Sequence, residues 1–143
     1  MAKKILAIDY GDSKIGTAYN DDLGITIQPY KTIFTKGSDR KAISEIKEIV
    51  KEKNIKKIVI GMPYNEDGTV GERAEKTKKF IKKLHNNLLY SGYDYIEIET
   101  HDERYTSIKA DETLKELNIN QKKGKKIQDT LAAYYILKSY LDK

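Results

Sequence analysis

The sequence predicts an α/β protein in which helices cover both faces of a mixed five-stranded sheet. Three strand-like segments follow one another in the first 34 residues, and strand-like and helix-like segments alternate after them. Consecutive strands joined by turns pair antiparallel, whereas strands separated by helices pair in parallel. We therefore expect three antiparallel N-terminal strands and then two parallel strands, within a single domain that spans residues 1–143.

The first two strands form a predicted hairpin. Residues 5–8 are all apolar, which is typical of a short strand buried on both faces. This strand ends at Asp9, a turn follows at Gly11 and Asp12, and a second apolar segment begins at Ile15. An ionised carboxylate at the end of a buried strand is costly unless a cation or hydrogen-bond donors surround it.

The middle of the chain predicts a strand, a helix and another strand. Pro29 marks an edge or a bulge in the third strand. A helix is expected over residues 39–53, because apolar residues recur at helical spacing after Ser38, which is a favourable N-cap. A buried strand follows at residues 58–61.

The second half of the chain predicts three helices around one strand. A helix begins at about residue 71, and a strand begins near Tyr95 and ends at residues 101–104. A shorter helix is expected after it, with Ala110, Leu114 and Leu117 facing inward. A polar, basic connection over residues 118–126 leads to a last helix over residues 127–141.

The composition excludes several kinds of site. The chain has no cysteine, so it contains no disulfide, no thiolate metal site and no cysteine nucleophile. Its apolar start is too short for a signal peptide, and no run approaches the roughly 18 apolar residues of a membrane span. We expect a cytoplasmic protein without a membrane partner. The net charge of +5 is a weak indication of a polyanionic partner.

Three acidic residues share an unusual position at the end of an apolar element. Asp9 ends the first strand, Glu103 closes with Asp102 the strand that begins near Tyr95, and Asp129 opens the last helix. Asp129 precedes Ala133 by four residues, so it lies on the apolar stripe of that helix. If the three carboxylates converge, they could hold one or two Mg²⁺ or Mn²⁺ ions, which prefer oxygen ligands. Such ions support phosphodiester cleavage.

Ordinary structural roles would also explain these acids. Asp9 could pair with Lys14 across the hairpin, and Glu103 could pair with Arg104 or a lysine. Asp129 near a helix start could simply complement the helix dipole. Ion pairs are commoner than metal sites, so the residues alone leave both interpretations open.

Four segments in order resemble the motifs of the YqgF family, which comprises pre-16S rRNA nucleases related to Holliday junction resolvases. The segments contain Asp9-Tyr10-Gly11, Val59-Ile60-Gly61-Met62-Pro63, Asp102-Glu103-Arg104-Tyr105-Thr106-Ser107 and Leu131-Ala132-Ala133. Each motif is weak alone, but together they span nearly the whole chain. The chain departs from the family pattern at Lys14, where the family usually has arginine. It also has Gly61 where the related resolvases carry an acid at the end of the fourth strand.

The resemblance implies an RNase H-like fold and a metal-dependent nuclease that acts in maturation of the 5′ end of precursor 16S ribosomal RNA. It implies that Asp9, Glu103 and Asp129 form the catalytic, metal-binding triad, with Mg²⁺ or Mn²⁺ as cofactor. Whether Asp102 assists Glu103 stays open at this stage.

Six further residues are candidates for nucleic-acid contacts. They are Tyr10, Gly11, Lys14, Arg104, Lys125 and Lys126. Tyr10 could stack on a base beside Asp9, and the two lysines before Asp129 could guide a phosphate backbone without reading its sequence. Gly11 lets a backbone approach closely, although turn geometry explains it equally well.

Two other functions remain open. The same chemistry could cut branched DNA as a Holliday-junction-type endonuclease, which usually needs a symmetric dimer. A non-catalytic nucleic-acid-binding protein could use the basic segments alone. For the nuclease itself, we expect a monomer or a weak homodimer with a structured RNA, or branched DNA, as its partner.

Overall fold

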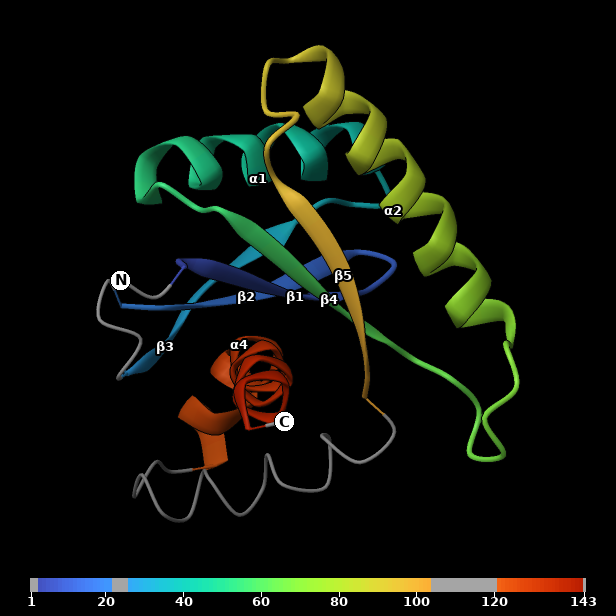
Figure 1. Ribbon diagram of the computed structural model, residues 1–143. Helices are drawn as coiled ribbons and strands as arrows, with labels where there is room; N and C mark the ends of the chain where they lie inside the picture. Colours follow the sequence, from blue (N-terminus) through green and yellow to red (C-terminus); the bar gives the residue numbers. More distant parts are fainter. Residues whose placement is uncertain (1–2, 22–25, 104–120, 143) are drawn as a thin grey trace.

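A five-stranded sheet forms the middle layer of the protein, as seen in a computed structural model (Figure 1). The structure describes residues 3–21, 26–103 and 121–142, and over residues 121–129 it describes the backbone alone. The strands are β1 (Ile5–Tyr10), β2 (Lys14–Asn20), β3 (Ile27–Phe34), β4 (Lys57–Met62) and β5 (Glu97–Asp102). Helices α1 (Asp39–Lys53) and α2 (Glu72–Tyr90) cover one face of the sheet, and α4 (Gln121–Leu141) covers the other (Figure 1).

The strand order β3-β2-β1-β4-β5 confirms the predicted mixed sheet. β2 pairs antiparallel with both β1 and β3, whereas β4 pairs in parallel with both β1 and β5. The C-terminal ends of the three parallel strands therefore lie side by side at one edge of the sheet. Open sheets commonly carry their functional sites at this edge.

The boundary of one predicted element changes, and another predicted element is not described. The last helix begins at Gln121 rather than near residue 127, so its first turns include much of the basic segment that we expected to be a connection. The shorter helix predicted around Ala110 and Leu114 lies outside the described residues. The N-cap prediction is confirmed, because the Ser38 hydroxyl accepts a hydrogen bond from the backbone N–H of Lys41.

The edge position of β3 explains its proline. Pro29 pairs with Ala18 of β2, next to a shift of register between Gly16 and Ala18. Proline cannot donate to a strand ladder, and both an edge and an irregular pairing tolerate this loss. Both features predicted from Pro29, an edge strand and an irregular pairing, are therefore present.

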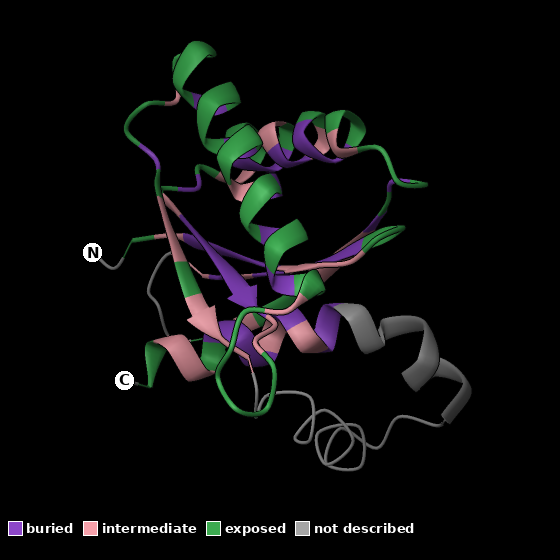
Figure 2. Ribbon diagram, turned by 90° about the vertical axis from the view of Figure 1, so that its right-hand side faces the viewer, coloured by how far each residue is buried: buried purple, intermediate pink, exposed green. Residues whose placement is uncertain are grey.

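Alternating residues of the strands build two apolar layers, one on each face of the sheet. The layer under α1 and α2 is the larger, and its buried side chains include Leu6, Ile8, Ile46, Ile58, Ile60, Phe80 and Leu84. The layer under α4 contains Ile5, Ala7, Ala18, Val59, Ala133, Ile136 and Leu137. Figure 2 shows the same division, with the outward sides of α1 and α2 exposed and their sheet-facing sides buried.

The C-terminal part of α4 is fixed to the strands by polar contacts. Lys57 Nζ donates to the hydroxyl oxygen of Tyr140 (2.7 Å), and the Tyr140 hydroxyl donates to Glu99 Oε2 (2.5 Å). His101 Nε2 and Ser139 Oγ are hydrogen-bonded at 2.8 Å. Helix α4 thus holds two alternate residues of β5 in place. In the described part of the chain, no helix has the length and apolar character that a membrane span requires.

Candidate active site

Strand alternation places Asp9 on the face of the sheet that α4 covers. Ile5 and Ala7, at alternate positions of β1, pack in the layer under α4, whereas Leu6 and Ile8 pack under α1 and α2. Asp9 is the next alternate residue after Ile5 and Ala7, so its side chain lies on the same face as theirs. It is half-buried at the C-terminal end of β1, which is the edge where sites usually form in such sheets.

Glu103 follows the last residue of β5 and meets Asp9 on this face. Its backbone N–H donates to the carbonyl oxygen of Met62 (3.2 Å), so the chain still runs beside β4 at this point. The Glu103 carboxyl group lies over Gly61, where an added Cβ would overlap Oε2 of Glu103. The side chains of Glu103 and Asp9 are hydrogen-bonded to each other. Two of the three predicted acids, distant in the sequence, therefore converge.

The electrostatics of this acid pair favour a shared proton. Burial of the Glu103 carboxyl group and the neighbouring charge of Asp9 raise the pKa of Glu103 to about 8. The hydrogen bond to Asp9 and the charge of Asp102 act in the same direction, whereas the charge of Arg73 lowers the pKa. Two carboxylates this close resist being ionised together unless a cation joins them.

Arg73 belongs to the site although the sequence analysis did not identify it. It lies in the first turn of α2, close enough for its charge to act on Glu103. With Lys76 and Thr77, Arg73 lines a small pocket of about 130 Å³. The facing wall of this pocket is the turn from Tyr10 to Asp12. Arg73 is one of only three arginines in a chain rich in lysine, and this rarity is the signal that could have found it.

Tyr10 does not lie beside Asp9 as a free base-stacking platform. Adjacent residues of a strand point to opposite faces, so Tyr10 points toward α1 and α2. Its ring stacks on Phe80, with the ring centroids 4.3 Å apart, and its hydroxyl donates to Asp39 Oδ1 (2.7 Å). Burial and this hydrogen bond raise the pKa of Tyr10 above its ordinary value. The ring is therefore engaged in packing.

The other predicted residues near the hairpin have simpler placements. A Cβ at Gly11 would lie 2.7 Å from the carbonyl oxygen of Lys14, so the turn itself requires glycine. The Lys14 side chain is exposed at the start of β2. Asp102 pairs with Met62 in the ladder and, by alternation, points to the face opposite Glu103.

Four predicted site residues fall outside what the structure describes. Arg104 lies beyond the described segment that ends at residue 103. Lys125, Lys126 and Asp129 lie in the part of α4 of which only the backbone is described. Further along this helix, Ala133 and Ile136 are buried against the sheet, on the apolar stripe that the sequence assigned to Asp129.

The donor set of the acid pair fits a hard divalent cation. Two carboxylates in contact offer oxygen ligands only, which suits Mg²⁺ or Mn²⁺. A bound cation would also offset the repulsion that holds a proton on Glu103. Among the described residues there is no group of three or more acidic or histidine side chains placed to hold a metal, so Asp9 and Glu103 stand as a pair.

Comparisons of sequence place the chain beside nucleases. The model of the family described as "RuvX: Holliday junction resolvase" matches residues 3–143. Proteins of Acetivibrio thermocellus and Ruminiclostridium cellulolyticum, each named "Putative pre-16S rRNA nuclease", are similar over nearly their whole length. The first is 42% identical over 139 residues, which cover 97% of this chain and 95% of the relative. The second is 44% identical over 140 residues, which cover 98% of this chain and 94% of the relative.

Comparisons of structure confirm the predicted fold. The Fowlpox virus resolvase in complex with Holliday junction DNA has a TM-score of 0.60 and 12% sequence identity, with 97% of each chain covered. RuvC of Thermus thermophilus in complex with a Holliday junction has a TM-score of 0.56 and 9% identity, with 96% of each chain covered. At these identities the likeness concerns the arrangement of helices and strands.

Proposed function

Because this chain belongs to the RuvX family, we propose that it is a metal-dependent nuclease that hydrolyses phosphodiester bonds during 5′-end maturation of precursor 16S ribosomal RNA. The contact between Asp9 and Glu103 is the observation that supports this most directly. The two side chains come from strands that are not neighbours in the sheet, and they meet at its C-terminal edge. Ordinary ion pairing does not explain why two acids are packed against each other.

Asp9, Glu103 and Asp129 are proposed to hold Mg²⁺ or Mn²⁺. The backbone of α4 and its buried stripe support the inclusion of Asp129, because Ala133 and Ile136 of that stripe pack on the same face of the sheet as Asp9. When bound, the metal supplies positive charge that stabilises the charge developing on the phosphate and makes a water nucleophile available near neutral pH.

The protein groups have distinct tasks in this proposal. Asp9 and Glu103 must both be ionised to bind the cation, so the proton that they share in the metal-free protein leaves when the site is loaded. Arg73 faces the same region from the start of α2 and can contact a non-bridging phosphate oxygen of the substrate. Gly61 leaves the space in which Glu103 lies.

Two substrates have to be distinguished, precursor ribosomal RNA and the Holliday junction. The curated relatives are named for precursor ribosomal RNA, whereas the family description names the Holliday junction. Resolution of a junction requires two matched cuts, and hence two sites related by symmetry. Cleavage of an RNA end requires one site. The number of chains in the active species therefore separates the two substrates.

A side-by-side cleavage assay tests the function. A 5′-extended precursor 16S rRNA fragment and a four-way DNA junction are titrated with Mg²⁺ and with Mn²⁺. Asp9→Asn and Glu103→Gln are expected to lower the rate at least 100-fold on the true substrate, because each removes a charged ligand. Glu97→Gln is the control, since Glu97 is an exposed carboxylate of the same strand β5.

Three results would contradict the proposal. They are full cleavage of the RNA by Asp9→Asn, equal losses in Glu97→Gln and Glu103→Gln, or cleavage that continues in a chelator. Cutting of the junction alone, by a species that light scattering shows to be a dimer, would assign the protein to DNA instead.

A further inference from the structure

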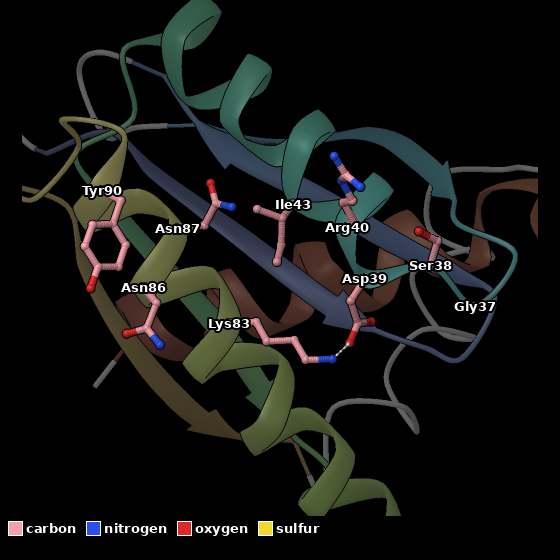
Figure 3. Close-up of a pocket in the computed structure, with 9 residues that line it drawn as sticks. All are labelled: Gly37, Ser38, Asp39, Arg40, Ile43, Lys83, Asn86, Asn87 and Tyr90. Carbon is pink, nitrogen blue, oxygen red and sulfur yellow. Dashed lines mark hydrogen bonds and ion pairs between the residues drawn. The ribbon is translucent and has the colours of Figure 1, made fainter.

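A second, larger pocket lies between α1 and α2 (Figure 3). These helices cover the face of the sheet opposite the one on which Asp9 lies. Its volume is about 600 Å³, which is within the range of small-ligand sites. Residues from the start of α1 and from the second half of α2 line it: Gly37, Ser38, Asp39, Arg40, Ile43, Lys83, Asn86, Asn87 and Tyr90. The nuclease chemistry proposed for Asp9 and Glu103 does not use this pocket.

The walls of this α1–α2 pocket favour an anionic ligand. Asp39, the one carboxylate of the lining, is compensated because Lys83 Nζ lies 3.1 Å from it and the Tyr10 hydroxyl donates to it. Arg40 adds a further exposed cation at the start of α1. Beyond the pocket, α2 carries five lysines from Lys76 onward, and the sequence has no acidic residue from there to position 93. A surface on which the charged side chains are all positive is complementary to a polyanion.

An aromatic ring stands at one end of the pocket (Figure 3). Tyr90 is 87% exposed, more than any other large hydrophobic residue in the described part of the chain. An exposed ring in a pocket that also contains cations is an arrangement on which bases of a single strand stack. The amides of Asn86 and Asn87, which also line the pocket, can each donate and accept hydrogen bonds with base edges.

One side of α2 joins this pocket to the acid pair. Arg73 and Lys76 line the small pocket near Asp9 and Glu103, and Lys83 and Tyr90 line the large one. Their spacing of three, seven and seven residues keeps them on one side of the helix. The 17 residues from Arg73 to Tyr90 rise about 26 Å along the helix. A strand stacked as in duplex DNA advances about 3.4 Å per nucleotide, so this length corresponds to at most about eight nucleotides and to fewer when the strand is extended.

We propose that the α1–α2 pocket binds a single-stranded RNA segment several nucleotides from the phosphodiester that the acid pair cleaves, an inference that rests on the proposed nuclease function. Arg40 contacts a phosphate, the Tyr90 ring stacks on a base, and the asparagine amides contact base edges. The substrate strand runs along α2 between the two pockets. The enzyme therefore holds its RNA by a single-stranded arm as well as at the cleavage point.

Binding without metal tests this pocket independently of cleavage. Fluorescence anisotropy measures the affinity of the full-length protein for a labelled single-stranded RNA 12-mer in EDTA. Tyr90→Ala is expected to weaken binding about 5- to 150-fold, the range measured when stacking aromatics are replaced by alanine. Tyr90→Phe keeps the ring and should bind within twofold of the unmodified protein. Tyr95→Ala, which removes a 56% exposed tyrosine outside the pocket, is the matched control and should have no effect.

A salt titration tests the phosphate contact. Arg40→Gln should reduce the slope of log affinity against log salt concentration by about 0.7, the value for one phosphate contact on a single strand. Lys138→Gln removes an exposed cation of α4, on the other face of the sheet and away from α2, and it should leave the slope unchanged.

The outcomes are decisive in either direction. Equal affinities for Tyr90→Ala and Tyr95→Ala, or an equal loss in Tyr90→Phe and Tyr90→Ala, would overturn the stacking role. A DNA 12-mer of the same sequence that binds more tightly than the RNA, with the larger dependence on Tyr90, would overturn the assignment to RNA. Because no cleavage is measured, these results stand even if Asp9→Asn shows that the acid pair is not catalytic.

Discussion

Replacing Gly61 by alanine probes the point where Glu103 meets the core of α4. An alanine Cβ would overlap Glu103 Oε2, and it would lie 2.5 Å from Cδ1 and 3.1 Å from Cγ1 of Ile136. Carbon atoms pack at about 3.5–4.0 Å, so Ile136 must retreat by roughly 1 Å. Ile136 has no exposed surface into which it could move. Both the carboxylate and the helix must therefore yield.

The cost of Gly61→Ala follows from these contacts. Overpacking a well-filled core costs about 1–3 kcal/mol, and the better strand propensity of alanine returns about 0.5–1 kcal/mol. We expect a net loss of about 1–2 kcal/mol in the free energy of unfolding, or roughly 3–8 °C in the melting temperature. Displacement of Glu103 by about 1 Å should also lower the cleavage rate about 100-fold.

A double-mutant cycle with Ile136→Val separates the two effects. Valine lacks Cδ1, the atom of Ile136 nearest to the added methyl group. The combined variant should recover about 0.5–1 kcal/mol relative to the sum of the single changes. It should not recover cleavage, since the overlap with Glu103 remains. Stability is measured by urea denaturation, and cleavage is measured on the labelled RNA precursor.

Two results would refute this reasoning. If Gly61→Ala keeps both stability and activity, Glu103 does not lie over Gly61. If the variant loses activity at full stability, with no coupling to Ile136, then Gly61 instead leaves room for the backbone of the substrate, as the sequence alone also allowed.

The remaining predictions concern the charges of the site and the anchoring of α4. In a chelator, the free energy of unfolding should fall as the pH rises from about 4.5 to about 8, because folded Glu103 keeps a proton that the unfolded chain has released. Urea denaturation at three pH values measures this decline, and Asp9→Asn should make it smaller. Arg73→Gln should shift the rising limb of the pH–rate profile to higher pH and lower the cleavage rate at pH 7 about fivefold, because the guanidinium lowers the pKa of Glu103. An unchanged profile would place Arg73 away from Asp9 and Glu103. Tyr140→Phe should cost about 1 kcal/mol of stability through the lost hydrogen bonds to Lys57 and Glu99, with cleavage unchanged within twofold; a large loss of activity at normal stability would contradict a purely structural role.

Local patterns were sufficient to predict the order of the elements that the structure describes, because each carries its own signal. The apolar run from Ile5 to Ile8 and the helical spacing after Ser38 depend on neighbouring residues only. The convergence of Asp9 with Glu103 was also predictable, since the carboxyl ends of parallel strands share an edge. What the pattern could not supply was the contact itself, which depends on the missing side chain of Gly61.

Two site residues show why the remainder was harder to predict. Tyr10 is adjacent to Asp9 in the sequence, but alternation along β1 sends it to the other face, where Phe80 and Asp39 engage it. Strict use of that alternation would have predicted that its ring packs under α1 and α2. Arg73 is an exposed residue of a helix rich in charge, and its approach to Glu103 depends on where α2 starts relative to the sheet edge. No local pattern encodes that distance.

The helix that carries Asp129 also fixes the segment that carries Glu103. Alternate residues of β5 meet successive positions of α4, Glu99 through the hydroxyl of Tyr140 and His101 through Ser139. Glu103 is the next residue in this series, and Ile136 packs beside it over Gly61. We therefore expect the separation of Asp9 and Glu103 to depend on the packing of Ile136 against the sheet as well as on the two carboxylates. Apolar residues of α4 that touch no substrate should therefore control how tightly the acid pair holds a metal.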